Sequence, residues 1–210
     1  MIDGIMGRKV GMTRVFEEGR GMTAVTVIQA GPCYVTQVKS ADTDGYEAVQ
    51  IGFEESRKLN KAERGHLQKS GLPSLKHLTE LRTDGAPEAR VGDKVDVGMF
   101  QPGDLVTVTG RSKGRGFTGV VKRHGFSGGP KTHGQSDRHR APGSIGSSTT
   151  PGRVLKGTRM AGHSGDAQVT VKNLRVVQCD PERNLVAVEG AVPGATKGLL
   201  VLRRSGRREG

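Results

Sequence analysis

Histidine and aspartate side chains gather in the middle of the sequence and could be imagined as metal ligands. They are His124, His133, His139, His163 and Asp137. Structural zinc sites usually contain thiolates or closely spaced pairs of ligands, and this region contains neither. Histidines among arginines more often donate hydrogen bonds to phosphates or stack on nucleic-acid bases. The sequence therefore predicts no metal site and favours contact with a nucleic acid.

The stretch GRGFTG, residues 114–119, has the glycine spacing of a dinucleotide-binding fingerprint, and the preceding DLVTVTG could be the strand that this fingerprint needs. The fingerprint also needs a helix that begins at the glycines, to hold the pyrophosphate, and an acidic residue about 20 positions later. The following VVKRH is soon broken by Gly125, and Asp137 is the only acid in reach. We therefore expect neither requirement to be met.

GHSGD, residues 162–166, resembles the nucleophile elbow of hydrolases only in part. The final glycine of that motif is missing, and no apolar strand leads into it. No arrangement of nucleophile and base supports catalysis elsewhere in the basic segment. The sequence therefore predicts that the protein is not an enzyme, with no catalytic residues, no cofactor and no small-molecule substrate.

Positive charge is concentrated in one part of the chain. The sequence has 33 Lys and Arg against 21 Asp and Glu, a formal net charge of +12 and a pI near 10.2. Residues 111–160 hold eleven of the basic residues and one acid, whereas the remaining residues hold 22 basic residues and 20 acids. A solvated charged face normally carries interspersed acids. The segment is better explained by a polyanionic partner that is met chiefly through it.

Residues 124–146, HGFSGGPKTHGQSDRHRAPGSIG, have Phe126 and Ile145 as their only large apolar residues. A segment that buries so little apolar surface cannot offset the entropy of ordering its backbone. Its glycines would let backbone N–H groups approach phosphates. RNA is favoured over DNA because no helix pattern here could enter a major groove. Phe117 and Phe126 are too few for a stacking platform, so packing at the base of the segment is favoured for both.

The rest of the chain consists largely of short β-branched runs between turn signals. Residues 22–53 contain three such runs, which predict a meander of antiparallel strands. Residues 54–81 are charged and carry spaced leucines, a pattern that fits one or two short helices. Strand signals return at residues 93–109 and again after the basic segment. Many short strands at regular spacing favour a small β-barrel, which also removes exposed strand edges.

The basic segment is thus predicted to be an insertion between strands of one body. Its ends lie close together if residues 105–109 and 169–177 share a sheet. We expect residues 1–110 and 166–210 to form the β-barrel body, with a short helical insertion near 55–82. Residues 111–165 are expected to form one long extended loop. The overall prediction is a mainly β protein whose loop is the binding element.

Two further features bear on where the protein works. No apolar run is long enough to span a membrane, and the first residues lack the apolar region of a signal peptide, so we expect a soluble protein with no membrane partner. Cys33 and Cys179 are the only cysteines, and both lie in strand-like runs without a paired motif. They are expected to be buried thiols in a reducing compartment.

The basic segment closely resembles a known sequence. GRSKGRGFTGVVKRHGFSGGPKTHGQSDRHRAPGSIG, followed by TPGRVLKGTRMAGHSG, is similar to the central extension of the universal large-subunit ribosomal protein L3 family, in its bacterial form. The flanking GRKVGMTRVF and ERNLVAVEGAVPGATKG also resemble that family. The resemblance implies a barrel of the type shared with translation factors, and a cytoplasmic protein of the large ribosomal subunit. Its partners would be 23S rRNA and neighbouring large-subunit proteins.

The resemblance further implies that the protein enters subunit assembly early, and that its loop extends toward the peptidyl transferase centre. Carried over to this sequence, it assigns rRNA contacts to basic and histidine residues along the loop: Lys113, Arg115, Lys122, Arg123, His124, Lys131, His133, Arg138, His139, Arg140, Arg153, Lys156, Arg159 and His163. The tip of the loop corresponds to 142–153 and includes Gly143, Ser144, Gly146, Ser147, Ser148, Thr149 and Thr150.

This chain departs from the family pattern at the tip. Some bacterial relatives carry a methylated Gln there, where this chain has Ser and Thr at 147–150, so we expect that modification to be absent. The C-terminal RRSGRREG has no family role that we can assign, and a frayed rRNA contact at the surface is expected. Two other function classes stay open on the residues alone. These are a free-standing RNA-binding chaperone or regulator and, more remotely, a nucleotide-dependent enzyme.

Overall fold

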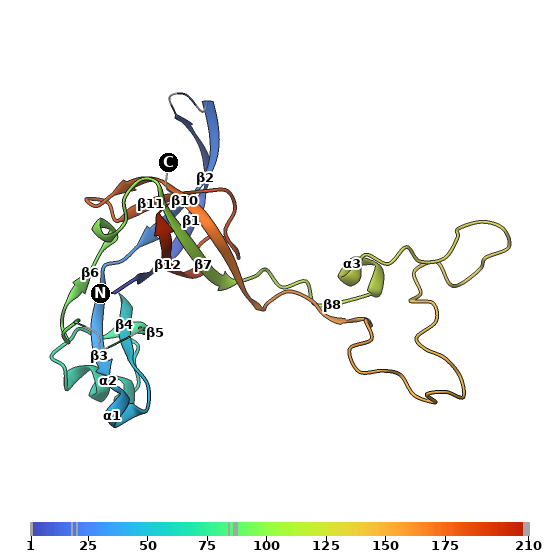
Figure 1. Cartoon of the computed structure of the whole chain (residues 1–210), viewed down its shortest axis with the longest axis horizontal. Coiled ribbons are helices and arrows are strands. Elements are labelled where there is room, and N and C mark those ends of the chain that lie inside the picture. Colours follow the sequence, from blue (N-terminus) through green and yellow to red (C-terminus); the bar gives the residue numbers. More distant parts are fainter. Residues whose placement is uncertain (1, 18, 20, 84, 86–87, 208–210) are drawn as a thin grey trace. The chain divides into compact units, whose positions relative to one another are not determined.

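The structure is a computed structural model that describes residues 2–17, 19, 21–83, 85 and 88–207. It divides the chain into two compact units (Figure 1). The body comprises Met1–Arg111 and Gln168–Gly210, and the insertion comprises Ser112–Ala167. Strands dominate the body, so the predicted mainly β class is confirmed. No helix in the described part of the chain is long and apolar enough to cross a membrane.

Six antiparallel strands of the body close into a barrel. Each strand hydrogen-bonds to the next, and the last returns to the first. In barrel order they are β1 (Gly4–Glu17), β12 (Leu199–Arg207), β7 (Asp104–Arg111), β10 (Gln168–Asp180), β11 (Leu185–Glu189) and β2 (Gly21–Ala30).

Along β7, side chains that face the core alternate with side chains that face outward. Val106 and Val108 are fully buried, whereas Thr107 and Thr109 between and beside them face partly outward. β7 pairs with β10 in the register that joins Val108 to Val171 and Arg111 to Gln168. Residues 105–109 and 169–177 therefore do share a sheet, which was the condition for the two ends of the insertion to lie close together.

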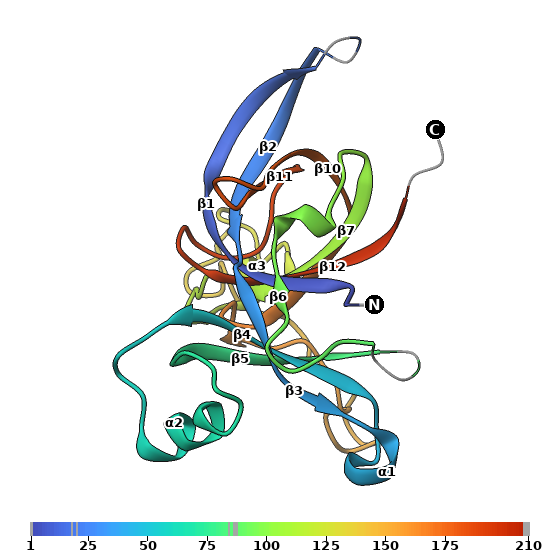
Figure 2. The same ribbon diagram turned by 90° about the vertical axis from the view of Figure 1, so that its left-hand side faces the viewer.

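A second sheet of four strands belongs to the same body (Figure 2). Its order is β5 (Leu75–Arg82), β4 (Ala48–Glu55), β3 (Cys33–Lys39) and β6 (Lys94–Val95). The predicted meander over residues 22–53 is therefore wrong in part, because β2 pairs within the barrel and only β3 and β4 pair with each other. Gly31, with φ +72°, and Pro32 end β2 and redirect the chain.

The leucine-bearing segment after β4 forms one helix and one strand. The helix α2 (Lys61–Gln68) begins at a capping box in which Asn60 and Glu63 each bond the other's backbone N–H. A second helix is not formed in this segment, because Leu75 and Leu81 lie on β5 and are buried against β4. A one-turn helix, α1 (Ala41–Asp44), lies between β3 and β4, in the region where turn signals separate the strand-like runs of residues 22–53. A short 3-10 turn, η1 (Val97–Met99), follows β6.

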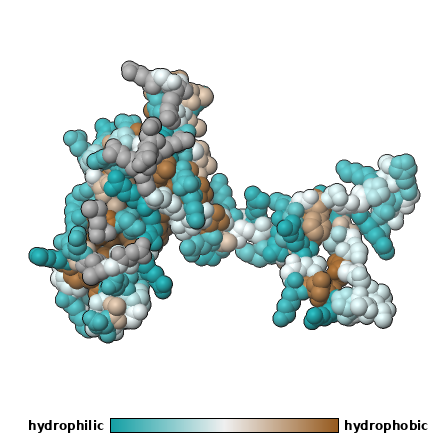
Figure 3. Space-filling model, viewed as in Figure 1, coloured by the Kyte–Doolittle hydropathy of each residue, from teal (hydrophilic) through white to brown (hydrophobic). Residues whose placement is uncertain are grey.

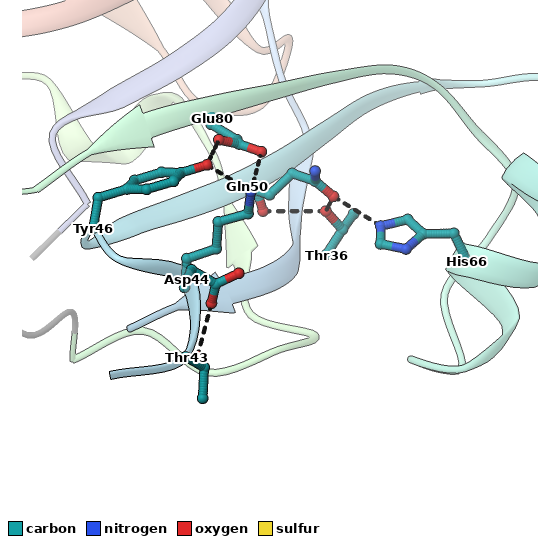
Figure 4. Close-up of polar contacts among 8 residues, drawn as sticks. Thr36, Thr43, Asp44, Tyr46, Gln50, His66 and Glu80 are labelled. Atoms are coloured by element: carbon teal, nitrogen blue, oxygen red, sulfur yellow. Dashed lines mark hydrogen bonds and ion pairs between the residues drawn. The ribbon is translucent and has the colours of Figure 1, made fainter. Parts of the chain in front are cut away.

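Polar contacts fix α2 to this sheet (Figure 4). The Thr36 hydroxyl on β3 donates to the side-chain oxygen of Gln50 at 2.7 Å, and Nε2 of His66 on α2 donates to the same oxygen at 2.9 Å. Farther along the sheet, the Tyr46 hydroxyl donates to Glu80 at 2.8 Å. The bonds to Gln50 satisfy polar groups that the packing of α2 withdraws from water.

The N-terminal strand β1 has no counterpart among the sequence predictions. Glycines interrupt its alternation, and their role is visible only in the packing. A Cβ at Gly7 would lie 2.6 Å from the Gln29 carbonyl oxygen, so only glycine lets β1 approach β2 this closely. The buried residues Ile5 and Met6 beside it belong to the core of the barrel.

The two cysteines are free thiols on strands. Cys33 is buried in β3, and its burial raises the pKa to about 12. Cys179 on β10 is half-buried, and burial raises its pKa to about 11. Both thiols are therefore protonated at neutral pH. The prediction of buried thiols on strands is confirmed for Cys33 and holds in part for Cys179, which is only half-buried.

The C-terminal basic run is anchored at its start. Arg203 on β12 pairs with Asp3 at 2.9 Å, and Arg204 pairs with the fully buried carboxylate of Asp104 at 3.0 Å. The expectation of a frayed run is therefore wrong for these two arginines, because each one forms an ion pair with another residue of the body. Residues 208–210 lie outside the described residues.

Candidate nucleic-acid interface

The insertion begins and ends as a paired ribbon. β8 (Phe117–Thr118) is antiparallel to β9 (Gly162–His163), with Phe117 opposite His163 and Thr118 opposite Gly162. Before β8, the N–H of Ser112 donates to the Ala167 carbonyl at 2.9 Å. We call residues 112–118 and 162–167 together the stem. The stem joins segments more than forty positions apart in sequence, so the insertion has an organisation of its own.

Backbone hydrogen bonds run along the stem. The N–H of Arg115 donates to the Ser164 carbonyl at 2.8 Å, and the N–H of Ser164 donates to the Gly116 carbonyl at 2.9 Å. Gly165 has φ +73°, and a Cβ there would overlap the carbonyl oxygen of Lys113. Both the conformation and the close approach require glycine at this position.

A short helix follows β8 at the GRGFTG sequence. α3 (Val120–His124) begins after Gly119 and ends at Gly125, which adopts a left-handed conformation with φ +76°. The expectation that no helix begins at these glycines is therefore wrong. α3 is only five residues long because Gly125 closes it, and Val120 is its one buried residue.

Two of the predicted rRNA-binding side chains of α3 turn back to the insertion itself. The Arg123 guanidinium donates to the Met160 carbonyl at 2.8 Å, and Nε2 of His124 donates to the same oxygen at 3.1 Å. The Arg123 guanidinium also lies against Gly162, where a Cβ would be 2.7 Å from it. Arg123 and His124 therefore hold the outgoing and returning chains together.

A second closure lies farther along the insertion. The N–H of Gly129 donates to the His139 carbonyl at 3.0 Å, and Nδ1 of His139 donates to the Pro130 carbonyl at 3.1 Å. We call residues 131–137, which these bonds close off, the inner loop. The ring of His139, one of the residues predicted to contact RNA, stabilises the base of this loop.

The remaining basic side chains point outward. In residues 112–167, all of which the structure describes, Arg138 makes one ion pair, a long and exposed contact of 3.9 Å with Asp137. The other exposed basic side chains of the insertion, apart from Arg123, make no ion pair or side-chain hydrogen bond there: Lys113, Arg115, Lys122, Lys131, Arg140, Arg153, Lys156 and Arg159. On the face drawn in Figure 3, most of the surface of the insertion is hydrophilic or neutral.

The tip consists of exposed residues, most of which are small. Ser144 bonds locally, its hydroxyl donating to the Gly146 carbonyl at 3.0 Å, and the N–H of Gly152 donates to the Ser148 carbonyl at 3.1 Å. Arg153 is the only charged residue of 142–153. The predicted tip residues are all exposed: Gly143, Ser144, Gly146, Ser147, Ser148, Thr149 and Thr150.

The two phenylalanines of the insertion differ from the sequence expectation. Packing was predicted for both, but the Phe117 side chain is 79% exposed, because the two-stranded stem has no layer to cover its face. Phe126 is half-buried, with its ring centroid 6.0 Å from that of His124. The sequence shows that the insertion has two phenylalanines, but the exposure of their side chains could not be predicted from it.

The histidines do not assemble into one site. His133 and His163 are exposed, whereas His124 and His139 bond to backbone carbonyls at separate closures. Among the described residues, the structure brings no three His, Cys, Asp or Glu side chains together in a way that could hold a metal ion.

Comparisons with known proteins agree with one another. The family model for ribosomal protein L3 matches residues 88–184, which include the whole insertion. Relatives named large ribosomal subunit protein uL3 match nearly the full chain. The one from Roseiflexus sp. (strain RS-1) is 56% identical over 207 residues, which cover 98% of each chain. The one from Chloroflexus aggregans is 57% identical over 208 residues, covering 98% of this chain and 99% of the relative.

A more distant match extends the same result. The uL3 protein of Corynebacterium urealyticum is 49% identical over 204 residues, which cover 96% of this chain and 94% of the relative. Identity at this level extends over almost all of both chains. The chain belongs to the ribosomal protein L3 family.

Proposed function

We propose that this protein is a structural constituent of the large ribosomal subunit and binds 23S rRNA chiefly through its insertion. The observation that carries the proposal is the row of exposed basic side chains in residues 112–167 that have no partner within the insertion. Asp137 and Asp166 are the only acids of that unit. The insertion has almost no hydrophobic core. A folded RNA can neutralise its unpaired cations and thereby order its backbone.

The arrangement divides the predicted rRNA-binding residues into two roles. Arg123, His124 and His139 stabilise the insertion by bonding its own carbonyls. The outward side chains, such as Arg115, Lys131 and Arg140, are free to meet phosphates. Phosphate contacts supply affinity and position without reading sequence, which suits a protein that follows the irregular shape of folded rRNA.

The finer parts of the proposal rest on the family resemblance. The protein enters assembly of the large subunit early, works in the cytoplasm as part of that subunit, and contacts neighbouring ribosomal proteins. Its tip, 142–153, extends toward the peptidyl transferase centre. The tip offers short hydroxyl groups and glycines but no activated nucleophile or base, so it positions rRNA and carries out no chemistry.

The salt dependence of rRNA binding tests the proposal. If about half or more of the basic side chains meet phosphates, the log–log slope of affinity for 23S rRNA against salt should be roughly −4 to −8. Arg138→Ala plus Arg140→Ala should make the slope shallower by about one to two units. The matched control is Arg57→Ala plus Arg64→Ala, which removes two exposed arginines from the body and should leave the slope unchanged.

Sedimentation of a cell extract addresses the rival assignment. A structural constituent should travel almost entirely with large subunits. A large pool that sediments as free protein would instead indicate a free-standing RNA-binding chaperone or regulator. Equal slopes for the two double variants would contradict the role given to the insertion.

A further inference from the structure

A pocket of about 380 Å³ lies wholly within the insertion. It is bounded by the chain just after α3, by the inner loop, and by the first residues of the tip. Phe126, Gly128, Gln135, Arg138 and Pro142 contribute to its lining. Its volume is in the range, about 300–1,000 Å³, that holds small organic groups in proteins.

The walls of this pocket are fixed by the second closure of the insertion. The N–H of Gly129, a lining residue, donates to the His139 carbonyl at 3.0 Å and so joins the two sides. Gly128 has φ +76°, and a Cβ there would overlap the His139 carbonyl oxygen. The pocket is therefore part of the local fold and does not arise from two chains that happen to pass each other.

Three side chains give the pocket its chemical character. Phe126 is half-buried and presents an aromatic surface. Gln135 is half-buried, and its side-chain amide has no hydrogen-bond partner among the residues that the structure describes. Arg138 supplies guanidinium donors, since its 3.9 Å contact with Asp137 is long and 80% of its side chain is exposed. An apolar plane thus lies beside one unused amide and one planar cation.

We propose that this pocket holds a single unstacked nucleobase of 23S rRNA, an inference that rests on the proposed function. Unstacked bases in folded RNA are held by stacking on aromatic or guanidinium planes and by hydrogen bonds to their edges. The Gln135 amide can both donate to and accept from a base edge, while the Arg138 guanidinium can donate to ring nitrogens or carbonyl oxygens.

A phosphate group suits this pocket less well. Arg138 is its only charged lining residue, and Phe126, Ala141 and Pro142 make much of the remaining wall apolar. The N–H of Gly129, which could have donated to a phosphate, is already bonded to the His139 carbonyl. A site for phosphate would gather several donors, whereas a site for a base needs a plane and a few edge contacts.

The test uses the full chain and 23S rRNA transcript, with affinity measured across salt concentrations and base reactivity probed chemically. Phe126→Leu keeps apolar bulk but removes the aromatic plane, and it should weaken binding by about 5- to 100-fold with an unchanged salt slope. One nucleotide protected by the wild-type protein should become reactive. Phe126→Tyr, which keeps the ring, should restore both affinity and protection.

Lys131→Ala is the matched control, because Lys131 is exposed on the neighbouring inner loop and makes no side-chain bond there. It should make the salt slope shallower by about one unit and leave the protected nucleotide protected. If Phe126→Leu binds like wild type and every nucleotide stays protected, or if it changes the slope as Lys131→Ala does, the pocket holds no base. In either case the proposed function stands, whereas failure of the wild-type chain to bind 23S rRNA would overturn the proposed function itself.

Discussion

Phe117 presents an aromatic ring to solvent, 79% exposed, on the stem opposite His163. An exposed ring between Arg115 and the basic side chains of α3 can stack on a base without any change in the body. Phe117→Ala should therefore weaken binding to 23S rRNA by about 1–3 kcal/mol and leave the melting temperature unchanged. Binding titration and calorimetry measure the two effects. Phe16→Ala, which removes an 80% exposed phenylalanine from β1 of the body, is the control and should change neither.

His77 on β5 gives the body a predicted pH dependence. Burial, and next the positive charge of Arg8, lower the pKa of His77 below its ordinary value of 6.5, while Glu54 opposes this shift and Lys76 adds to it. The unfolded chain therefore binds this proton more readily than the folded one. The contribution of His77 is fully present above about pH 6.5 and is lost as the pH falls toward the folded pKa.

His77→Gln tests this directly. Urea unfolding at about pH 7.5 and at about pH 5.5 should show a smaller loss of stability in the variant than in the wild type. Glu54 does not confuse the comparison, because the hydrogen bond from Arg8 lowers its pKa below 4.5, so its own contribution is lost only at lower pH. Equal losses in both proteins would show that His77 is not the titrating group.

At the scale of elements, the stem depends on one glycine. Gly165→Val would force a β-branched residue to φ +73° and place its Cβ on the Lys113 carbonyl oxygen. We expect the stem to open, so that the amides of Arg115 and Ser164 exchange faster with solvent and affinity for rRNA falls. Amide exchange of the free protein measures the first effect. Gly119→Ala, at a position where a Cβ meets nothing within 4 Å, should leave both amides protected.

An element can be predicted from the sequence when its own residue pattern selects it, and not when contact with a strand elsewhere in the chain selects it. That β7 is a strand follows from alternation, because Val106 and Val108 repeat with the period of a strand, whereas its pairing with β10 is seen only in the structure. Leu75 and Leu81 were read with a helical segment, since spaced leucines fit a helix and the burial that selects a strand comes from β4, a distant partner. Tertiary pairing overrides local pattern there.

The insertion shows the same limit more strongly. Its basic and glycine-rich character, and its position between two strands, could be predicted from composition. Its closures could not, because they are bonds between backbone groups such as the Gly129 N–H and the His139 carbonyl, which no side-chain pattern encodes. For the same reason, the turn of Arg123 toward Met160 and the pocket beside Gln135 became visible only in the fold.

At the scale of the whole molecule, the two units differ in what stabilises them. The hydrophobic core cluster, with Ile28, Val108 and Leu202 fully buried, lies entirely in the body. In the insertion, Val120 and Thr118 are the only residues classed as buried, and all of its residues are described. Apolar burial therefore stabilises the body, whereas the insertion has little of it, and under the proposed function RNA neutralises its charge and orders it.

This division predicts that the arginines beside the inner loop and the tip of the insertion fail differently in ribosomes. Arg138→Ala plus Arg140→Ala should chiefly lower the yield of large subunits, because phosphate contacts that help the protein assemble are lost. Ser147→Trp places bulk on the exposed tip, which adds little Coulombic affinity because Arg153 is its only charged residue. Subunits carrying it should form in normal yield but show slower peptide-bond formation, or altered sensitivity to drugs that bind at the peptidyl transferase centre.

Purified variant ribosomes allow both quantities to be measured, subunit yield by sedimentation and peptide-bond formation in a single turnover. Ser147→Ala is the control for the tip, because it removes the hydroxyl without adding bulk and should separate crowding from a lost hydrogen bond. A rate and a drug response equal to wild type for Ser147→Trp, with full incorporation of the protein, would show that the tip does not reach the centre. Membership of the L3 family would be unaffected by that result, since it rests on the whole chain and not on the tip.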